Sequence, residues 1–395
     1  MILSNARLIL PEGIREGLDV VVTDGKIAGI RERSVAEALD LGDNYLAPGF
    51  IDLHIHGALG RDTMDASLES FRAICDYHAS GGTTSLLLTT STAPIEDIVA
   101  VLRAVRKIGG NLPPIRGVHV EGPFLSRSRP GAQRGEFIRN PDHGLVEQLL
   151  EFADVIKRVT LAPELPGVLP LVHELRNRGI AVSGGHSDAW EEDARAAFEH
   201  GMRHVTHTFN CMSSARRRGI FRVAGLLEFA LSEPEITCEL IADGYHVLPA
   251  LMKMLYHAKS CDGICLVTDA TAGAGMPEGS QFKLSGVECK VAGGVCLLAD
   301  GSALAGSASR MIDLVRTLVR STQIPLHHAV TMATRTPART LGLTNKGKLE
   351  VGADADFAVL SADLAVLQTF VGGRQTFPST ARAGSARSRA RLRDG

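Results

Sequence analysis

Short apolar segments of strand length alternate with amphipathic segments of helical length through most of the chain. The segments that we expect to be strands are residues 49–56, 84–89, 115–121, 158–161, 180–186, 204–207, 236–242 and 264–269. The expected helices include residues 69–79, 95–107, 169–178, 191–200 and 248–259. Such alternation predicts parallel βα units, and about eight strands are the number that closes a barrel. The sequence therefore predicts an α/β fold with a (β/α)8 TIM barrel over residues 48–345.

The two ends of the chain have a different pattern, in which short strand-like runs are separated by turns. Asp24 and Gly25 stand between two apolar runs, which is typical of a β-hairpin. Residues 352–374 have the same strand-like character. We therefore expect residues 1–47 and 346–377 to form one small β-sandwich domain beside the barrel.

The distribution of charge argues against a nucleic-acid partner. The 395-residue chain has a formal net charge of -2, and residues 378–395 hold five arginines and one aspartate. The rest of the chain is therefore acidic overall, and a folded nucleic-acid-binding domain usually carries a basic face instead. The basic tail has almost no apolar bulk, so we expect it to be disordered.

Composition also bears on the compartment of the protein. No apolar run reaches the ~18 residues that a membrane helix needs, and the N-terminus lacks the basic-then-apolar order of a signal peptide. We therefore expect a cytoplasmic protein with no membrane partner. The seven cysteines include no Cys-x-x-Cys pair, so we expect neither disulfides nor a thiolate zinc site.

Residues of the type that bind metals recur at the ends of the predicted strands. They are His54, His56, Glu121, His186, His207 and Asp269. In a barrel the carboxyl ends of the strands form one face, where active sites lie, and alternation along a strand puts both histidines of the first strand on the same side. Imidazole and carboxylate groups suit a divalent ion such as zinc or iron. We expect His119, which shares a face with Glu121, to orient that carboxylate.

Two further features point to an anionic substrate. His246 follows the seventh predicted strand, beside a glycine that permits a tight turn. Arg216, Arg217 and Arg218 follow the sixth strand, and they are either a solvated loop or a clamp for a phosphate or carboxylate. Their place on the expected active face favours the clamp.

Taken together, several motifs resemble the amidohydrolase superfamily, and within it the N-acetylglucosamine-6-phosphate deacetylases. They are Pro48-Gly49-Phe50-Ile51-Asp52, His119-Val120-Glu121-Gly122-Pro123-Phe124, Gly184-Gly185-His186-Ser187, Thr206-His207-Thr208-Phe209-Asn210, Ala242-Asp243-Gly244-Tyr245-His246 and Leu266-Val267-Thr268-Asp269-Ala270-Thr271. The resemblance implies a barrel with a small β-sandwich. It also implies a metal-dependent enzyme, usually a homodimer, that removes acetate from N-acetyl-D-glucosamine 6-phosphate.

The resemblance also implies roles for individual residues. Glu121, His186 and His207 would hold the principal metal ion, and Asp269 would be the general base and acid. His246 would bind the sugar phosphate together with one arginine of the cluster Arg216 to Arg218. The family's arginine aligns best with Arg218, and it reaches the substrate from the neighbouring subunit. The other residues expected in the substrate site are Ala132, Gln133, Asn210, Cys211, Leu304, Ala305 and Gly306.

Two features of the family pattern vary, namely the histidine pair of the first strand and the residue at position 133. Some members lack the histidine pair of the first strand and work with one ion, whereas His54 and His56 would permit a second. Gln133 stands where the family usually has a histidine that contacts the substrate near the scissile acetyl group. Glutamine donates a hydrogen bond but carries no charge. The sequence therefore leaves open which sugar epimer is the substrate, whether it is phosphorylated and which acyl group is removed.

Other readings compete with this one. Related amidohydrolases act on cyclic amides or N-acyl amino acids, and many use a carboxylated lysine on the fourth strand. Lys157 lies at the start of that strand, which is the wrong end. A deacetylase of N-acetylgalactosamine 6-phosphate and a non-catalytic relative are further alternatives, although a non-catalytic relative typically loses its metal ligands or the aspartate.

Overall fold

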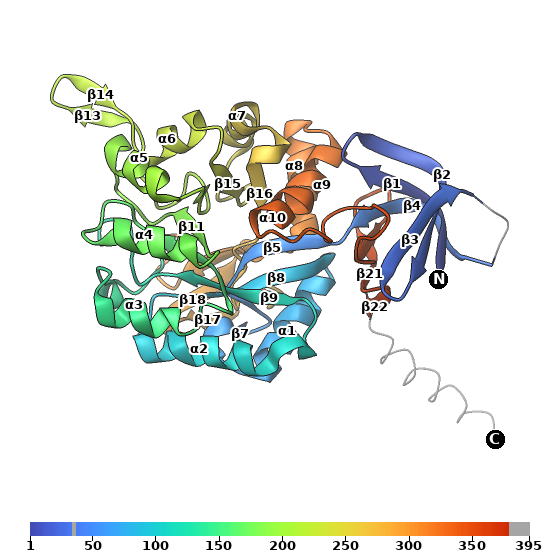
Figure 1. The fold of residues 1–395 in the computed structure, drawn as a ribbon, viewed down its shortest axis with the longest axis horizontal. Coiled ribbons are helices and arrows are strands. Elements are labelled where there is room, and N and C mark those ends of the chain that lie inside the picture. Colours follow the sequence, from blue (N-terminus) through green and yellow to red (C-terminus); the bar gives the residue numbers. More distant parts are fainter. Residues whose placement is uncertain (34–36, 379–395) are drawn as a thin grey trace.

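The computed structural model describes residues 1–33 and 37–378, and it consists of a barrel with a sheet at one side (Figure 1). The predicted basic tail lies outside these residues, apart from Pro378. Among the described residues, every helix is too short or too polar to cross a membrane.

Eight parallel strands form the predicted barrel. In spatial order they are β16 (Ile264–Leu266), β15 (Thr237–Leu240), β12 (His204–Val205), β11 (Ala181–Gly184), β10 (Ile156–Leu161), β9 (Ile115–Glu121), β8 (Thr83–Thr90) and β5 (Phe50–Ile55). The ring closes just beyond β16, where the Asp269 N–H donates to the His54 carbonyl at 2.9 Å and the His56 N–H donates to the Ala270 carbonyl at 2.8 Å. The predicted TIM barrel is confirmed.

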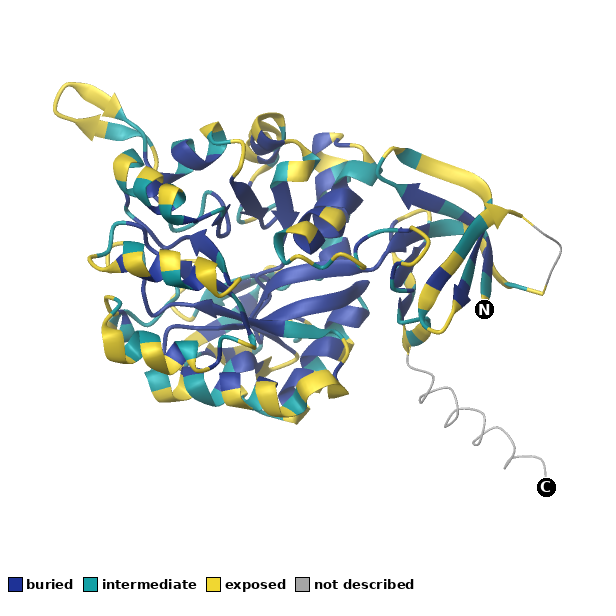
Figure 2. Cartoon of the chain, in the orientation of Figure 1, coloured by how far each residue is buried: buried dark blue, intermediate teal, exposed yellow. Residues whose placement is uncertain are grey.

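Helices surround the barrel and turn their apolar faces towards it. They are α1 (Leu68–Ala79), α2 (Ile95–Ile108), α3 (His143–Leu150), α4 (Val168–Asn177), α5 (Glu191–His200), α6 (Leu226–Ser232), α7 (Pro249–Lys259), α8 (Met311–Thr322), α9 (Leu326–Ala333) and α10 (Arg335–Thr340). In α2 the buried residues Ile98, Val101, Leu102 and Val105 have helical spacing. Figure 2 shows buried strands at the centre and exposed residues on the outer faces of the helices.

The chain ends meet in a seven-stranded sheet. Its order is β22 (Arg374–Phe377), β21 (Val366–Val371), β20 (Phe357–Leu360), β4 (Leu39–Pro48), β1 (Ile2–Leu10), β2 (Gly13–Thr23) and β3 (Lys26–Glu32). Asp24 and Gly25 form the tight turn between β2 and β3, both with positive φ, as the predicted hairpin requires. At the junction with the barrel, a Cβ on Gly49 would lie 2.2 Å from Thr84 Oγ1. Only glycine therefore lets β4 run into β5.

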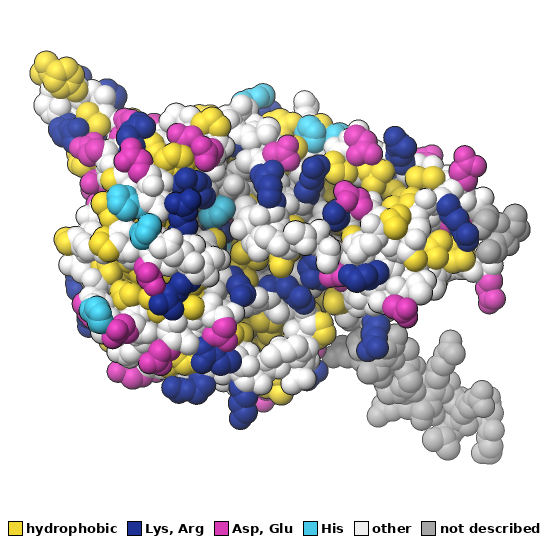
Figure 3. Space-filling model, viewed as in Figure 1, with side chains coloured by type: hydrophobic (Ala, Val, Ile, Leu, Met, Phe, Trp, Pro, Cys, Tyr) yellow, Lys and Arg dark blue, Asp and Glu magenta, His cyan; other side chains and the backbone are white. Residues whose placement is uncertain are grey.

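Three small sheets lie in the loops. They are β6 (Gly57–Ala58) with β7 (Arg61–Asp62), β13 (Arg216–Arg218) with β14 (Phe221–Val223), and β17 (Gln281–Leu284) with β18 (Val287–Ala292) and β19 (Val295–Leu298). The β13–β14 hairpin projects away from the barrel (Figure 1). Figure 3 shows hydrophobic side chains at the tip of the hairpin, where Ile220 and Phe221 are 85% and 69% exposed.

Candidate active site

The six predicted metal-type residues converge at the carboxyl end of the barrel. Three of them lie just past their strands in the left-handed backbone region, with φ of 46° at His186, 29° at His207 and 49° at Asp269. This conformation is uncommon for residues other than glycine and costs about 1–3 kcal/mol each. It explains why β11, β12 and β16 end before the predicted residues, and it turns these side chains away from the strand direction.

The carboxylate of Glu121 joins two groups of possible metal ligands. Its Oε1 lies 3.2 Å from His186 Nε2 and 3.3 Å from His207 Nε2. Its Oε2 lies 3.2 Å from His56 Nε2 and 3.6 Å from His54 Nε2. Each oxygen therefore faces a different pair of histidines.

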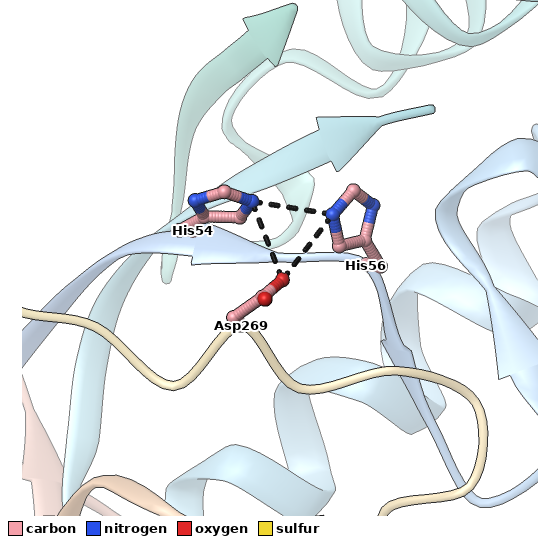
Figure 4. Close-up of side chains that lie close together, drawn as sticks. All are labelled: His54, His56 and Asp269. Carbon is pink, nitrogen blue, oxygen red and sulfur yellow. Dashed lines mark hydrogen bonds and ion pairs between the residues drawn. The ribbon is translucent and has the colours of Figure 1, made fainter. Parts of the chain in front are cut away.

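Asp269 completes the second group. Its Oδ1 lies 3.4 Å from the Nε2 atom of each of His54 and His56, and the three side chains point towards a common centre (Figure 4). The ligand atoms within each group, Glu121–His186–His207 and His54–His56–Asp269, lie within 4.8 Å of one another. Both groups are of the size that one ion could fill.

The hydrogen bonds of the far ring nitrogens indicate that a cation belongs between the near ones. Nδ1 of His186 lies 2.9 Å from the Arg129 carbonyl, and Nδ1 of His207 lies 3.2 Å from the Asn210 carbonyl. A carbonyl only accepts, so each Nδ1 carries the proton and each Nε2 presents a lone pair. These two Nε2 atoms are 3.0 Å apart. Two lone pairs at this distance repel unless a positive charge lies between or beside them, and the donor set fits a divalent ion.

Electrostatics agree with this requirement. Burial alone would lower the pKa of His54, but the carboxylates of Glu121 and Asp269 raise it well above the usual value. Burial would raise the pKa of Glu121, but the charge of His54 and the hydrogen bond of His186 hold it well below the usual value. The buried carboxylates thus favour positive charge at the point where the imidazoles meet.

Sequence reasoning missed one residue of this centre, Glu239 on β15. Its side chain is 1% exposed, and its Oε2 lies 3.2 Å from His54 Nδ1. The available signal was an acidic residue inside the short apolar strand Thr237–Leu240, where an unpaired charge would be costly.

The structure corrects the expected role of His119. Its Nε2 lies 2.7 Å from Thr160 Oγ1 and its Nδ1 lies 3.3 Å from Thr89 Oγ1. Its ring packs edge-on against that of His54, with centroids 4.6 Å apart. His119 therefore supports His54 from below, and its ring nitrogens bond the two threonines rather than the carboxylate of Glu121.

A cavity of about 260 Å³ opens above the two ligand groups. Most of the predicted substrate residues line it, namely Ala132, Gln133, Asn210, Cys211, His246, Leu304 and Gly306. Ala305 lies behind this wall, and its carbonyl accepts from Thr271 Oγ1 at 3.2 Å. Thr271, Leu284 and Ala303 also line the cavity, although the sequence reasoning did not single them out.

Gln133 contacts one of the metal-type residues, Glu121, directly. Its Nε2 donates to Glu121 Oε2 at 2.6 Å, and its Oε1 accepts from the Thr92 N–H at 2.7 Å. The backbone contact fixes the amide orientation, because an N–H can only donate. A neutral donor at this position orients Glu121 without placing a second positive charge beside its carboxylate.

The three consecutive arginines lie outside the cavity of their own chain. Arg216 donates to Asp188 Oδ1 at 2.6 Å and stacks on the Trp190 ring, 4.0 Å from its centre. Arg218 forms an ion pair with Glu192 at the surface. Arg216 and Arg218 therefore share one face of the hairpin, and alternation places Arg217 on the other.

Comparison with known proteins agrees with this geometry. The model of the amidohydrolase family matches residues 45–376, which is most of the chain. The chain belongs to the amidohydrolase family. The resemblance of its motifs to this family is thereby confirmed.

Several members of the family are similar over nearly their whole length. An N-acetylglucosamine-6-phosphate deacetylase of Lysinibacillus sphaericus is 37% identical over 95% of this chain and 97% of its own. An N-acetylgalactosamine-6-phosphate deacetylase of Escherichia coli O157:H7 is 33% identical over 94% and 98%. The structure of the N-acetyl-D-glucosamine-6-phosphate deacetylase of Mycobacterium smegmatis has a TM-score of 0.89 at 30% identity, covering 95% of this chain and 99% of that one.

Because Glu121 faces both groups, its substitution is expected to weaken metal binding at both. Glu121→Gln removes the negative charge while keeping the shape of the side chain. We expect the number of zinc ions retained after dialysis to fall for both groups, as measured by elemental analysis of the purified protein. Glu136→Gln, an exposed change outside the cavity, is the control and should retain the wild-type amount. Unchanged metal content in Glu121→Gln would contradict a role for this carboxylate as a ligand.

Proposed function

We propose that the protein is a metal-dependent hydrolase that converts N-acetyl-D-glucosamine 6-phosphate to D-glucosamine 6-phosphate and acetate. The observation that carries the proposal is the placement of Glu121 between two ligand groups, with Asp269 beside them, at the floor of a small cavity. This arrangement provides a site for a cation and a base at one point, as metal-assisted amide hydrolysis requires. The similarity to sugar phosphate deacetylases narrows the substrate class.

The proposed chemistry assigns separate tasks to the residues of the site. A divalent ion such as zinc or iron, when bound, would polarise the acetyl carbonyl and lower the pKa of a water to roughly 7. Asp269 takes a proton from the attacking water and passes it to the leaving nitrogen. Glu121, His186 and His207 would hold the principal ion, and His54 and His56 a second. Gln133 and His246, both on the cavity wall, would orient the acetyl group and the sugar.

The cavity has one clear partner for a phosphate. His246 Nδ1 lies 2.7 Å from Asp243 Oδ2, and the Asp243 carboxylate also accepts from the His246 N–H. Burial on its own would lower the pKa of His246, but Asp243 outweighs it and raises the pKa above its usual value. His246 therefore keeps a positive charge to higher pH than an ordinary histidine, which suits a phosphate dianion.

This single charge leaves the phosphate site incomplete within one chain. Among the described residues, those that line the cavity include neither lysine nor arginine. We propose that a second copy of the chain supplies the missing guanidinium from its projecting β13–β14 hairpin, in a homodimer. The hydrophobic residues at the tip, Ile220 and Phe221, would be buried in that interface.

The register of the hairpin favours other arginines than Arg218 as the phosphate contacts, although Arg218 aligns best with the family's arginine. Arg217 stands directly opposite Arg222, on the face away from Arg216 and Arg218. Within the described part of the chain no ion pair links Arg217 or Arg222 to a carboxylate, whereas Arg216 and Arg218 each have one. Two like charges side by side are unfavourable without an anion between them. We therefore propose Arg217 and Arg222, rather than Arg218, as the phosphate contacts.

An acetate-release assay tests the function. Four substrates are compared, N-acetylglucosamine and N-acetylgalactosamine, each with and without the 6-phosphate. We expect the highest kcat/KM with N-acetylglucosamine 6-phosphate, and a fall of several orders of magnitude in kcat for Asp269→Asn, since the amide cannot accept the proton. Elemental analysis should show that Asp269→Asn retains the ion held by Glu121, His186 and His207.

Two outcomes of this assay would contradict the proposal. Preference for the galactose epimer would assign the enzyme to the related sugar phosphate. Normal turnover in Asp269→Asn would remove the proton-transfer role from this residue.

The arginine assignment has its own test. Arg217→Gln and Arg222→Gln should each raise KM for the phosphorylated sugar by about 10-fold or more, because each loses a charged hydrogen bond worth ~1.5–3 kcal/mol. Arg218→Gln is the matched control on the opposite face, and its KM should change little. The reverse pattern, with Arg218→Gln the most affected, would contradict the assignment.

A further inference from the structure

The carboxylate of Glu239 connects the two ligand groups from below. Its Oε2 lies 3.2 Å from His54 Nδ1 and also accepts from the backbone N–H of His207 at 3.0 Å. His54 belongs to the group that includes Asp269, and His207 belongs to the other. One buried oxygen atom therefore contacts a ligand residue of each group.

Arg158 keeps Glu239 ionised. Its Nη1 lies 2.8 Å from Glu239 Oε1, and both side chains are almost fully buried. A guanidinium stays charged in a protein, so this buried pair is satisfied only when the partner is an ionised carboxylate. An ionised carboxylate accepts hydrogen bonds only. The Nδ1 atom of His54 must therefore carry a proton.

A layer of hydroxyl groups fixes Arg158 in turn. Arg158 donates to Ser183 Oγ at 3.0 Å, and Ser183 and Thr160 each lie 2.7 Å from Thr206 Oγ1. Thr160 also contacts His119, the ring that packs against His54. Strands β9, β10 and β11 and the residue that follows β12 thus share one buried polar layer with β5 and β15. Such a layer holds Glu239 in a single position.

We propose that Glu239 is a positioning residue that makes the His54–His56–Asp269 group able to bind an ion. By accepting the Nδ1 proton of His54, it leaves the lone pair of Nε2 facing His56 and Asp269, which are 3.2 Å and 3.4 Å away. A simple structural ion pair with Arg158 would not require Oε2 to face His54. The inference rests on metal binding by this site and not on the identity of the sugar.

Glu239→Gln tests the inference through metal binding. An amide can turn its NH2 towards His54 Nδ1, so His54 can shift its proton to Nε2 and lose its lone pair there. We expect wild-type protein to bind two zinc ions per chain in a titration with a competing chelator. The variant should bind one ion with wild-type affinity and the other 10- to 100-fold more weakly, the usual effect of losing a residue that orients a ligand.

Three further variants locate the effect. Asp356→Asn, a buried carboxylate that pairs with Lys346, is the matched control and should still bind two ions. His56→Ala should bind one ion, and adding Glu239→Gln to it should cause no further loss. If Glu239→Gln fails to fold because Arg158 is left unpaired, Arg158→Met with Glu239→Met removes both charges and should show the same weakening.

The outcomes separate this inference from the proposed function. Two ions bound by Glu239→Gln as tightly as by the wild type would overturn it, and so would a wild-type chain that binds only one. A wild type that binds two ions but releases no acetate from any sugar would refute the deacetylase proposal and leave the role of Glu239 standing.

Discussion

The site depends on one buried carboxylate, that of Glu121, whose two oxygens face two different groups of ligands. Nearly all of its neighbours are imidazoles, so the charge of Glu121 is balanced only by protons or by metal ions. A buried charge without such balance is costly. The ends of several strands therefore place their side chains so that positive charge can balance the buried carboxylate of Glu121.

The barrel meets this requirement through backbone strain as well as side-chain choice. His186, His207 and Asp269 adopt left-handed conformations just beyond their strands, and the contacts around them offset the cost. Below them, Glu239, Arg158 and the layer of hydroxyl groups replace the apolar filling of an ordinary barrel. Contacts among these buried polar groups offset the free-energy cost of removing them from water.

Much of this could be predicted from the sequence, because the carboxyl ends of parallel strands converge whatever their exact register. That rule alone brought together six residues from distant parts of the chain. It could not find Glu239, which lies within a strand, or the bond from Gln133 to Glu121, which depends on loop geometry. The partners of His119 likewise depend on the register of three strands. The two faces of the arginine hairpin depend on the pairing of Arg217 with Arg222, in two short strands that the hydrophobic pattern did not predict.

Anomalous X-ray diffraction at the zinc edge from crystals of the zinc-loaded protein tests the central claim most directly. The account predicts two peaks about 3.5–4 Å apart, one beside Glu121 Oε1, His186 and His207 and the other beside Glu121 Oε2, His54 and His56. Peaks that lie out of reach of Glu121, or zinc bound only elsewhere on the molecule, would contradict it.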